Sequence, residues 1–345
     1  MKFEFTPGER ADAGTRRLAI ALIDHAIMQT EDRAIDPAEA IHEARKDMKK
    51  LRGLLRLVRS SAPKLYKAEN RAFRDAAAGL SALRDADVAL ETLDQVIETA
   101  RSAGLIRTSE GNRKHADQGT TADAAPLERS GLDHETLAQL RAQLEQYRAA
   151  AHERFGDPLA KLDVFRLKLL DARERVPDWR LKPASNADSA FASLGPGLRK
   201  TYRRGRKAMK KAQAEPSVEA FHDWRKRAKY LTYHLRLLRP GWPELLKAQR
   251  NEVKTLADLL GDDHDLAVLA ELLSTLDGGD AAHDADAAAK QALLTEIGRQ
   301  SEQLRRRAFG VGRVVYAESP KAIGQRLSAY WRQAEINTAE QQNAG

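Results

Sequence analysis

The segment HEARKDMKKLRGLLRLVR at residues 42–59 returns, without a gap, as HDWRKRAKYLTYHLRLLR at residues 222–239. Each copy begins with a histidine, and arginine, lysine and lysine follow it at the third, fourth and seventh positions. At about 100° per residue, these side chains share one side of an α-helix. The repeat therefore predicts two copies of one helical element that presents a row of cations.

The composition favours a helical protein built from two related halves. The chain has 345 residues, of which 42% are hydrophobic and 31% charged, and strand patterns are nearly absent. Short connections between long amphipathic helices favour antiparallel neighbours, so each half is expected to be a four-helix bundle. We predict an N-terminal half over residues 1–176, a C-terminal half over 188–335 and a disordered tail over 336–345.

Several helix boundaries can be predicted from capping residues and prolines. Asp36 and Pro37 open the first repeat helix, and Glu215-Pro216-Ser217 precedes the second. One helix is expected from about residue 64 to 103, and a break is expected at Gly156-Asp157-Pro158. Residues 107–131 lack apolar periodicity, which predicts a mobile loop.

The composition also excludes several classes of site. The chain contains no cysteine, so disulfides, thiolate metal sites and cysteine nucleophiles are ruled out. Its first residues, MKFEFTPGERADAG, carry charge where a signal peptide needs an apolar core, and no apolar run is long enough to span a bilayer. The expected location is the cytoplasm, and no membrane partner is expected.

Two cationic arcs emerge when the repeats are placed on helical wheels. The first arc contains His42, Arg45, Lys46, Lys49, Arg52 and Arg56. The second contains His222, Arg225, Lys226, Lys229 and Arg236, with Tyr233 among them. The helix before the second repeat adds a third basic face, formed by Arg199, Arg203, Arg206 and Lys210 with Lys207 at its margin. This third face and the second arc are expected to wall one groove.

The sign of these arcs points to an anionic ligand. No acidic residue falls on either repeat arc, and neighbouring like charges destabilise a helix by a few tenths of a kcal/mol per pair. Arginine and lysine are the side chains that bind phosphate. Nucleic-acid recognition would also need base contacts, for which the few aromatic residues offer little. A linear polyphosphate needs only a row of cations.

The same residues carry a resemblance to a known family. HEARKDMKKLRGLLRLVR, LRDADVALETL, TYRRGRKAMKKA, and FHDWRKRAKYLTYHLRLL with LADLLGDDHDLAVL occur in this order between about residues 9 and 331. In this the chain resembles CHAD (conserved histidine α-helical domain) proteins. The resemblance implies two four-helix bundles related by a pseudo-twofold axis, a basic groove between them and inorganic polyphosphate as the ligand.

Matching positions imply which residues face that ligand. They are the cations of the first arc together with Arg203, Arg206, Lys207, His222, Arg225, Lys226, Lys229 and Arg236. The match has two departures: Thr232 stands where Arg52 is expected to recur, and the N-terminal helix lacks a counterpart of YRRGRK. Some relatives also carry a triphosphate tunnel domain, for which this chain has no room, so its activity is not transferred.

Acidic residues follow each repeat helix and leave an alternative open. Asp85 and Asp87 lie in LRDADV, and Asp263 and Asp265 lie in GDDHDL. We expect these carboxylates to orient arginine and histidine side chains. They could instead hold a divalent metal, as in a polyphosphate or nucleotide phosphohydrolase or phosphotransferase.

The favoured interpretation is a polyphosphate-binding protein that is not an enzyme and uses no metal or other cofactor. No catalytic motif is visible in the sequence. A second alternative is a module that binds nucleic acid or an acidic protein. If polyphosphate is the ligand, polyphosphate granules become an expected location within the cytoplasm.

Overall fold

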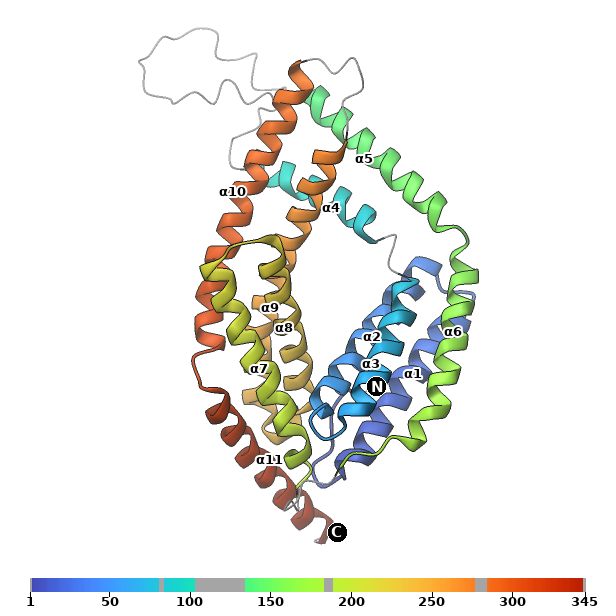
Figure 1. Ribbon diagram of the computed structural model, residues 1–345, viewed down its shortest axis with the longest axis vertical. Helices are drawn as coiled ribbons and strands as arrows, with labels where there is room; N and C mark the ends of the chain where they lie inside the picture. Colours follow the sequence, from blue (N-terminus) through green and yellow to red (C-terminus); the bar gives the residue numbers. More distant parts are fainter. Residues whose placement is uncertain (1, 81–83, 103–133, 183–188, 277–283, 344–345) are drawn as a thin grey trace. The chain divides into compact units, whose positions relative to one another are not determined.

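The computed structural model describes residues 2–80, 84–102, 134–182, 189–276 and 284–343. These residues form α-helices and two short 3₁₀ helices and contain no strand (Figure 1), so the predicted all-α class is confirmed. The loop expected over 107–131 lies outside the described residues. None of the described helices combines the length and the apolar character that crossing a membrane requires.

The described helices follow one another along the chain. In order they are α1 (Ala11–Glu31), α2 (Pro37–Val58), α3 (Pro63–Ala78), α4 (Arg84–Ser102), α5 (His134–Phe155), α6 (Pro158–Arg175), η3 (Val176–Asp178), α7 (Phe191–Ala214), α8 (Val218–Leu237), η4 (Arg239–Gly241), α9 (Pro243–Thr275), α10 (Asp284–Val315) and α11 (Pro320–Asn343).

The predicted boundaries of the two repeat helices are confirmed by their caps. The Asp36 carboxylate accepts hydrogen bonds from the backbone nitrogens of Ala38 and Glu39 at 2.8 and 3.3 Å. The Ser217 hydroxyl accepts one from the backbone nitrogen of Ala220 at 3.2 Å. The break between α5 and α6 is also confirmed, and Gly156 adopts a positive φ of 72° there.

Two expectations about helix extent were wrong. The single helix expected over 64–103 is two helices, because α3 ends at Ala78 and α4 begins at Arg84. Gly79, a weak helix former, follows α3, and Leu80 after it is 2% exposed. The tail expected to be disordered from residue 336 is helical as far as Asn343, since Ala, Glu and Gln favour helix even when exposed.

The chain folds into two compact units that do not follow the two predicted halves. Unit 1 comprises Met1–Ser81, Asp157–Leu260 and Ala308–Gly345, and unit 2 comprises Ala82–Gly156 and Gly261–Arg307. Each unit therefore contains segments from both 1–176 and 188–335. The physical reason is that α9 and α10 are long helices that run from one unit into the other without a break.

In unit 1, α2 is the helix around which the others pack. It contacts α1, α3 and α6, and it also contacts α7 and α8. Leu51, Leu54 and Leu55 of α2 are fully buried between these neighbours. The apolar side of the repeat helix thus forms the core of the unit, as its periodicity predicts.

Two glycines allow α2 to approach α7 and α8 closely. A Cβ atom at Gly197 of α7 would lie 1.7 Å from the backbone oxygen of Leu57. A Cβ atom at Gly53 of α2 would lie 3.0 Å from the Cβ of Tyr233 on α8. Gly53 and Tyr233 hold the same position in the two repeats, so the repeats meet at equivalent residues.

Unit 2 has its own hydrophobic core, formed by segments of α4, α5, α9 and α10. Leu93, Leu269, Leu273 and Ala289 are fully buried within it. Beside this core the Asp263 carboxylate, 2% exposed, accepts a hydrogen bond from Arg305 Nε at 2.7 Å and another from the Ser301 hydroxyl. Its charge is therefore paired within the unit.

Replacing Gly197 with alanine tests the close approach of α2 and α7. Because the new methyl group would overlap a backbone oxygen, we expect Gly197→Ala to lower the free energy of unfolding by about 2 kcal/mol or more. Gly310→Ala in α10 is the matched control, since a Cβ there meets no atom within 4 Å. The control is expected to stabilise the helix by up to about 1 kcal/mol. Unfolding of both variants is measured by circular dichroism. Equal unfolding midpoints would contradict the tight contact between α2 and α7.

Candidate functional site

The cationic residues predicted from the repeats lie on three helices of unit 1. We call them the α2 stripe (His42, Arg45, Lys46, Lys49, Arg52, Arg56), the α7 stripe (Arg199, Arg203, Arg206, Lys207, Lys210) and the α8 stripe (His222, Arg225, Lys226, Lys229, Tyr233, Arg236). Each stripe combines exposed and half-buried side chains, and among these residues only Arg56 is buried. The stripes differ in the neighbours that they contact.

The α2 stripe runs along α3. Arg45 Nη1 donates to the backbone oxygen of Leu80 at 3.0 Å, just beyond the end of α3. Farther along α2, Arg52 Nε and Arg56 Nη1 donate to the Asn70 amide oxygen at 3.4 and 2.7 Å. Asn70 therefore holds two arginines of the stripe in place without neutralising their charge.

Arg56 lies inside the unit instead of on its surface. Its side chain is 8% exposed, and its guanidinium carbon lies 3.9 Å from the ring centroid of Tyr230 on α8 and 5.8 Å from that of Tyr66 on α3. Burial lowers the pKa of Arg56, and the Tyr230 and Tyr66 side chains offset part of this effect. The guanidinium thus joins α2, α3 and α8 through aromatic faces and a hydrogen bond.

One residue of the α8 stripe, Lys229, forms an ion pair with α9. Lys229 Nζ pairs with the Asp258 carboxylate at 3.2 Å, and Lys254 pairs with the other carboxylate oxygen at 2.5 Å. Burial tends to raise the pKa of Asp258, but the hydrogen bond from Lys254 and the charge of Lys229 outweigh it and lower the pKa. Burial raises the pKa of Tyr233 to about 12, so this phenol stays neutral.

The α2 and α8 stripes meet where the two repeat helices cross. Tyr233 of the α8 stripe lies against Gly53, and Arg56 of the α2 stripe lies against Tyr230. His234 is fully buried at the crossing, and its Nε2 lies 3.1 Å from the Gly53 carbonyl oxygen. A carbonyl oxygen only accepts, so His234 Nε2 carries the hydrogen. Burial lowers the pKa of His234 to about 3, which keeps the ring neutral.

Acidic partners correct the expectation that the arcs lack counter-charges. Lys46 pairs with Glu43 at 2.6 Å, and Lys226 pairs with Asp223 at 3.5 Å. The two pairs hold equivalent positions in the repeats. Glu43 and Asp223 lie just outside the arcs, but long lysine side chains reach them across three positions. The charge on the stripes is therefore smaller than the sequence argument assumed.

Two residues of the α7 stripe, Arg199 and Arg206, contact α11 or the residues just before it. Arg206 Nη1 donates to the backbone oxygen of Glu318 at 3.2 Å, just before α11. The hydroxyl of Tyr202, on the same side of α7, lies 3.0 and 3.2 Å from the backbone oxygens of Val315 and Glu318, which share its one hydrogen. Arg199 packs against Gly324 of α11. Arg199 and Arg206 thus lie against α11 and the residues just before it, whereas Arg203, Lys207 and Lys210 are exposed, and the groove expected between the α7 and α8 stripes stays a prediction.

All four predicted acidic residues lie in unit 2. Asp87 pairs with Arg148 Nε at 2.6 Å and with His152 Nε2 at 3.1 Å, and Asp263 pairs with Arg305. The partners of both carboxylates lie inside unit 2 and are none of the predicted stripe residues, so the role expected for these carboxylates beside the stripes stays a prediction. Asp265 is half-buried, and the side chain of Asp85 lies outside the described residues. In the described part of the chain, no group of three or more acidic, histidine or cysteine side chains could hold a metal ion.

Sequence reasoning missed the residues that hold the arginines. Arg59 is 5% exposed and donates to the Thr201 hydroxyl at 3.1 Å, and burial lowers its pKa to about 10. Asn70, Tyr66 and Tyr230 are equally central to Arg56, yet helical wheels carry no information about contacts between helices. Only Glu43 and Asp223 left a signal, because they recur at the same repeat position.

A family model now gives these features a wider context. The model of the CHAD domain matches residues 17–274, which is more than half of the chain. The chain belongs to the CHAD domain family. A crystal structure of the CHAD domain from the plant Ricinus communis is similar to it at 18% sequence identity and a TM-score of 0.48, covering 90% of this chain and 93% of that one. No curated protein matches the chain.

The buried His234 of this CHAD domain predicts a dependence of stability on pH. The unfolded chain protonates this histidine near about pH 6.5, whereas the folded chain resists protonation down to about pH 3. His234 therefore contributes its full stability above about pH 7 and loses it as the pH falls through this window. His234→Gln keeps an N–H donor for Gly53 but does not titrate.

The measurement is the free energy of unfolding of both proteins at a series of pH values. Relative to the variant, the wild type is expected to lose up to about 1.4 kcal/mol per pH unit below about pH 6. Carboxylates titrate in both proteins and cancel in the comparison. Parallel pH profiles for the two proteins would show that His234 is not buried as the structure describes.

Proposed function

We propose that this CHAD domain binds inorganic polyphosphate along the α2 and α8 stripes and does not catalyse a reaction on it. The observation that carries the proposal is the crossing of the two repeat helices, where Tyr233 contacts Gly53 and Arg56 contacts Tyr230. Both stripes belong to one compact unit, so a linear anion could follow one stripe and continue along the other. The amino-acid types on the stripes suit phosphate oxygens.

The exposure of the side chains supports a ligand that lies on the surface. His42, Lys46 and Lys49 on the α2 stripe and Lys226 on the α8 stripe are exposed. The ion pairs of Lys46 and Lys226 are exposed as well, and such pairs contribute only about 0–1 kcal/mol. A polyanion can therefore displace Glu43 and Asp223. Arg56 supports the stripe from below, since it is too buried to meet the ligand directly.

Neutralising four lysines of the two stripes tests the proposal. If each contact contributes about 0.5 kcal/mol, removing all four weakens polyphosphate binding about thirtyfold and reduces its dependence on salt. The affinity is measured by calorimetric titration at two salt concentrations. The variant combines Lys46→Gln, Lys49→Gln, Lys226→Gln and Lys229→Gln.

A control variant removes the same charge elsewhere in unit 1. Its four lysines are exposed and have no ion-pair partner among the residues that the structure describes, so their loss is expected to change mainly the net charge of the chain. The control combines Lys64→Gln, Lys168→Gln, Lys211→Gln and Lys247→Gln. We expect its affinity to stay within about threefold of the wild type. Equal losses of affinity in both variants would mean that polyphosphate binding depends on the net charge of the chain and not on the stripes.

The absence of catalysis has its own test. Purified protein incubated with polyphosphate and Mg²⁺ is expected to release no orthophosphate. Release that is lost on Asp87→Ala or Asp263→Ala would favour the phosphohydrolase alternative.

Displacement of polyphosphate by a DNA duplex at equal charge and physiological salt would favour a nucleic-acid module. Association with polyphosphate granules in cells belongs to the same proposal and would be lost in the four-lysine stripe variant.

A further inference from the structure

A pocket lies between α7 and α11, on the side of α7 that carries Arg199. Its volume is about 470 Å³, which is within the range of sites for small organic molecules. One helix contributes Phe191, Ala192, Pro196 and Arg199, and the other contributes Gly324, Gln325, Ser328, Ala329 and Arg332. The whole pocket lies in unit 1.

The charge in this pocket has one sign. Arg199 and Arg332 line it from opposite helices, and neither has a carboxylate within ion-pair distance among the described residues. The Gln325 amide and the Ser328 hydroxyl, also in the lining, have no hydrogen-bond partner in the described part of the chain either. Two guanidinium groups, an amide and a hydroxyl are thus available together as donors.

The helices are adapted to hold Arg199 in the pocket. A Cβ atom at Gly324 would lie 2.6 Å from Arg199 Cδ and 2.7 Å from its Cγ, so the arginine stem occupies the space that glycine leaves. This contact places the guanidinium over α11 and limits its freedom. On the other helix, Pro196 provides no N–H for the Ala192 carbonyl, the usual acceptor four residues earlier, and both residues line the pocket.

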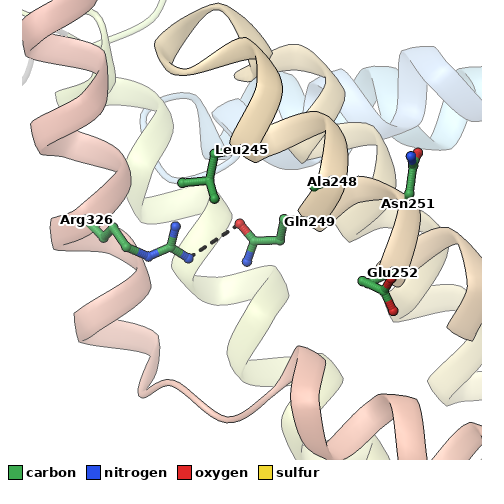
Figure 2. A pocket seen from close by; sticks show the side chains of 6 residues that line it. All are labelled: Leu245, Ala248, Gln249, Asn251, Glu252 and Arg326. Carbon is green, nitrogen blue, oxygen red and sulfur yellow. Dashed lines mark hydrogen bonds between the residues drawn. The ribbon is translucent and has the colours of Figure 1, made fainter.

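A second pocket in unit 1 contains an arginine whose charge is neutralised by a carboxylate. It lies between α9 and α11, has a volume of about 560 Å³ and is lined by Leu245, Ala248, Gln249, Asn251, Glu252 and Arg326. In Figure 2 Arg326 and Gln249 point toward one another, and Arg326 Nη2 donates a hydrogen bond to Gln249 Oε1 at 3.4 Å. Arg326 also pairs with Glu318 at 2.7 Å, and this hydrogen bond raises its pKa. That pocket has no unpaired arginine to attract an anion.

We propose that the α7–α11 pocket binds a terminal phosphate group, the doubly charged end of a phosphomonoester or of a phosphate chain. Arg199 and Arg332 approach the group from two sides and can each donate two hydrogen bonds to its oxygens. Ser328 and Gln325 donate to the remaining oxygens. Phe191, Pro196 and Ala329 form an apolar wall for an organic substituent, which accounts for a volume larger than phosphate itself needs. This site is independent of the α2 and α8 stripes.

Titration of the full chain with phenyl phosphate tests the site, because this probe has a terminal phosphate and an aromatic ring for the apolar wall. We expect saturable binding by calorimetry and broadening of the ³¹P resonance. The double variant Arg199→Gln, Arg332→Gln is expected to weaken binding at least about tenfold. Gly324→Ala is expected to weaken it too, although it removes no charge, because the methyl group displaces the stem of Arg199.

Two controls separate this site from general electrostatics and from polyphosphate binding by the stripes. Lys168→Gln with Lys247→Gln removes two exposed charges elsewhere and is expected to leave phenyl phosphate binding unchanged. The four-lysine stripe variant is also expected to bind phenyl phosphate normally, whatever its affinity for polyphosphate. Unchanged affinity in the Arg199 and Arg332 double variant would overturn the proposal.

Competition identifies the source of the phosphate group. Trimetaphosphate is a ring without terminal groups, and it is expected not to compete with phenyl phosphate. Tripolyphosphate has two ends, so its competition would assign the pocket to the ends of phosphate chains. If tripolyphosphate fails while phenyl phosphate binds, the pocket is assigned to organic phosphomonoesters. Competition by trimetaphosphate as strong as that of phenyl phosphate would overturn the requirement for a terminal phosphate.

Discussion

The close packing of α2 against α7 and α8 is the constraint on which the rest of unit 1 depends. At Gly197 the backbones of α7 and α2 approach so closely that no side chain fits between them. At Gly53 the two repeat helices meet, and the buried His234 donates a hydrogen bond across the contact. These contacts leave the apolar side of α2 inside the unit and set the direction in which its cations project. The positions of the stripes follow from backbone sterics before any charge is considered.

The electrostatics of the site are organised in two layers. Arg56 and Arg59 are buried, and neutral groups hold them: Asn70, Thr201 and the ring of Tyr230. Burial lowers the pKa values of both arginines, which is the sign of charges kept in the interior without carboxylate partners. Outside them lie exposed lysines with weak acidic partners. A polyanion would meet the outer layer while the inner layer maintains a positive potential beneath it.

Two cations of α7, Arg199 and Arg206, contact α11 or the residues just before it. Arg206 is used to attach α7 to the chain just before α11, whereas Arg199 lines a pocket with Arg332. A stripe that is uniform in sequence is therefore divided by its neighbours into a structural residue and a candidate ligand-binding residue. Arg206 donates through Nη1 to a backbone oxygen, whereas Arg199 has no hydrogen-bond partner among the described residues, and this difference separates the roles of the two arginines.

The sequence by itself determined the helical class, the caps at Asp36 and Ser217, the break at Gly156 and the membership of the cationic arcs, because helix periodicity and capping act between residues close in the chain. It also carried the motifs of the CHAD family. The tertiary structure alone decided that Arg56 is buried against Tyr230, that Arg199 faces α11, and that segments of both halves share each compact unit. These outcomes depend on which helices pack against one another. A helical wheel describes a single helix and gives no information about its neighbours.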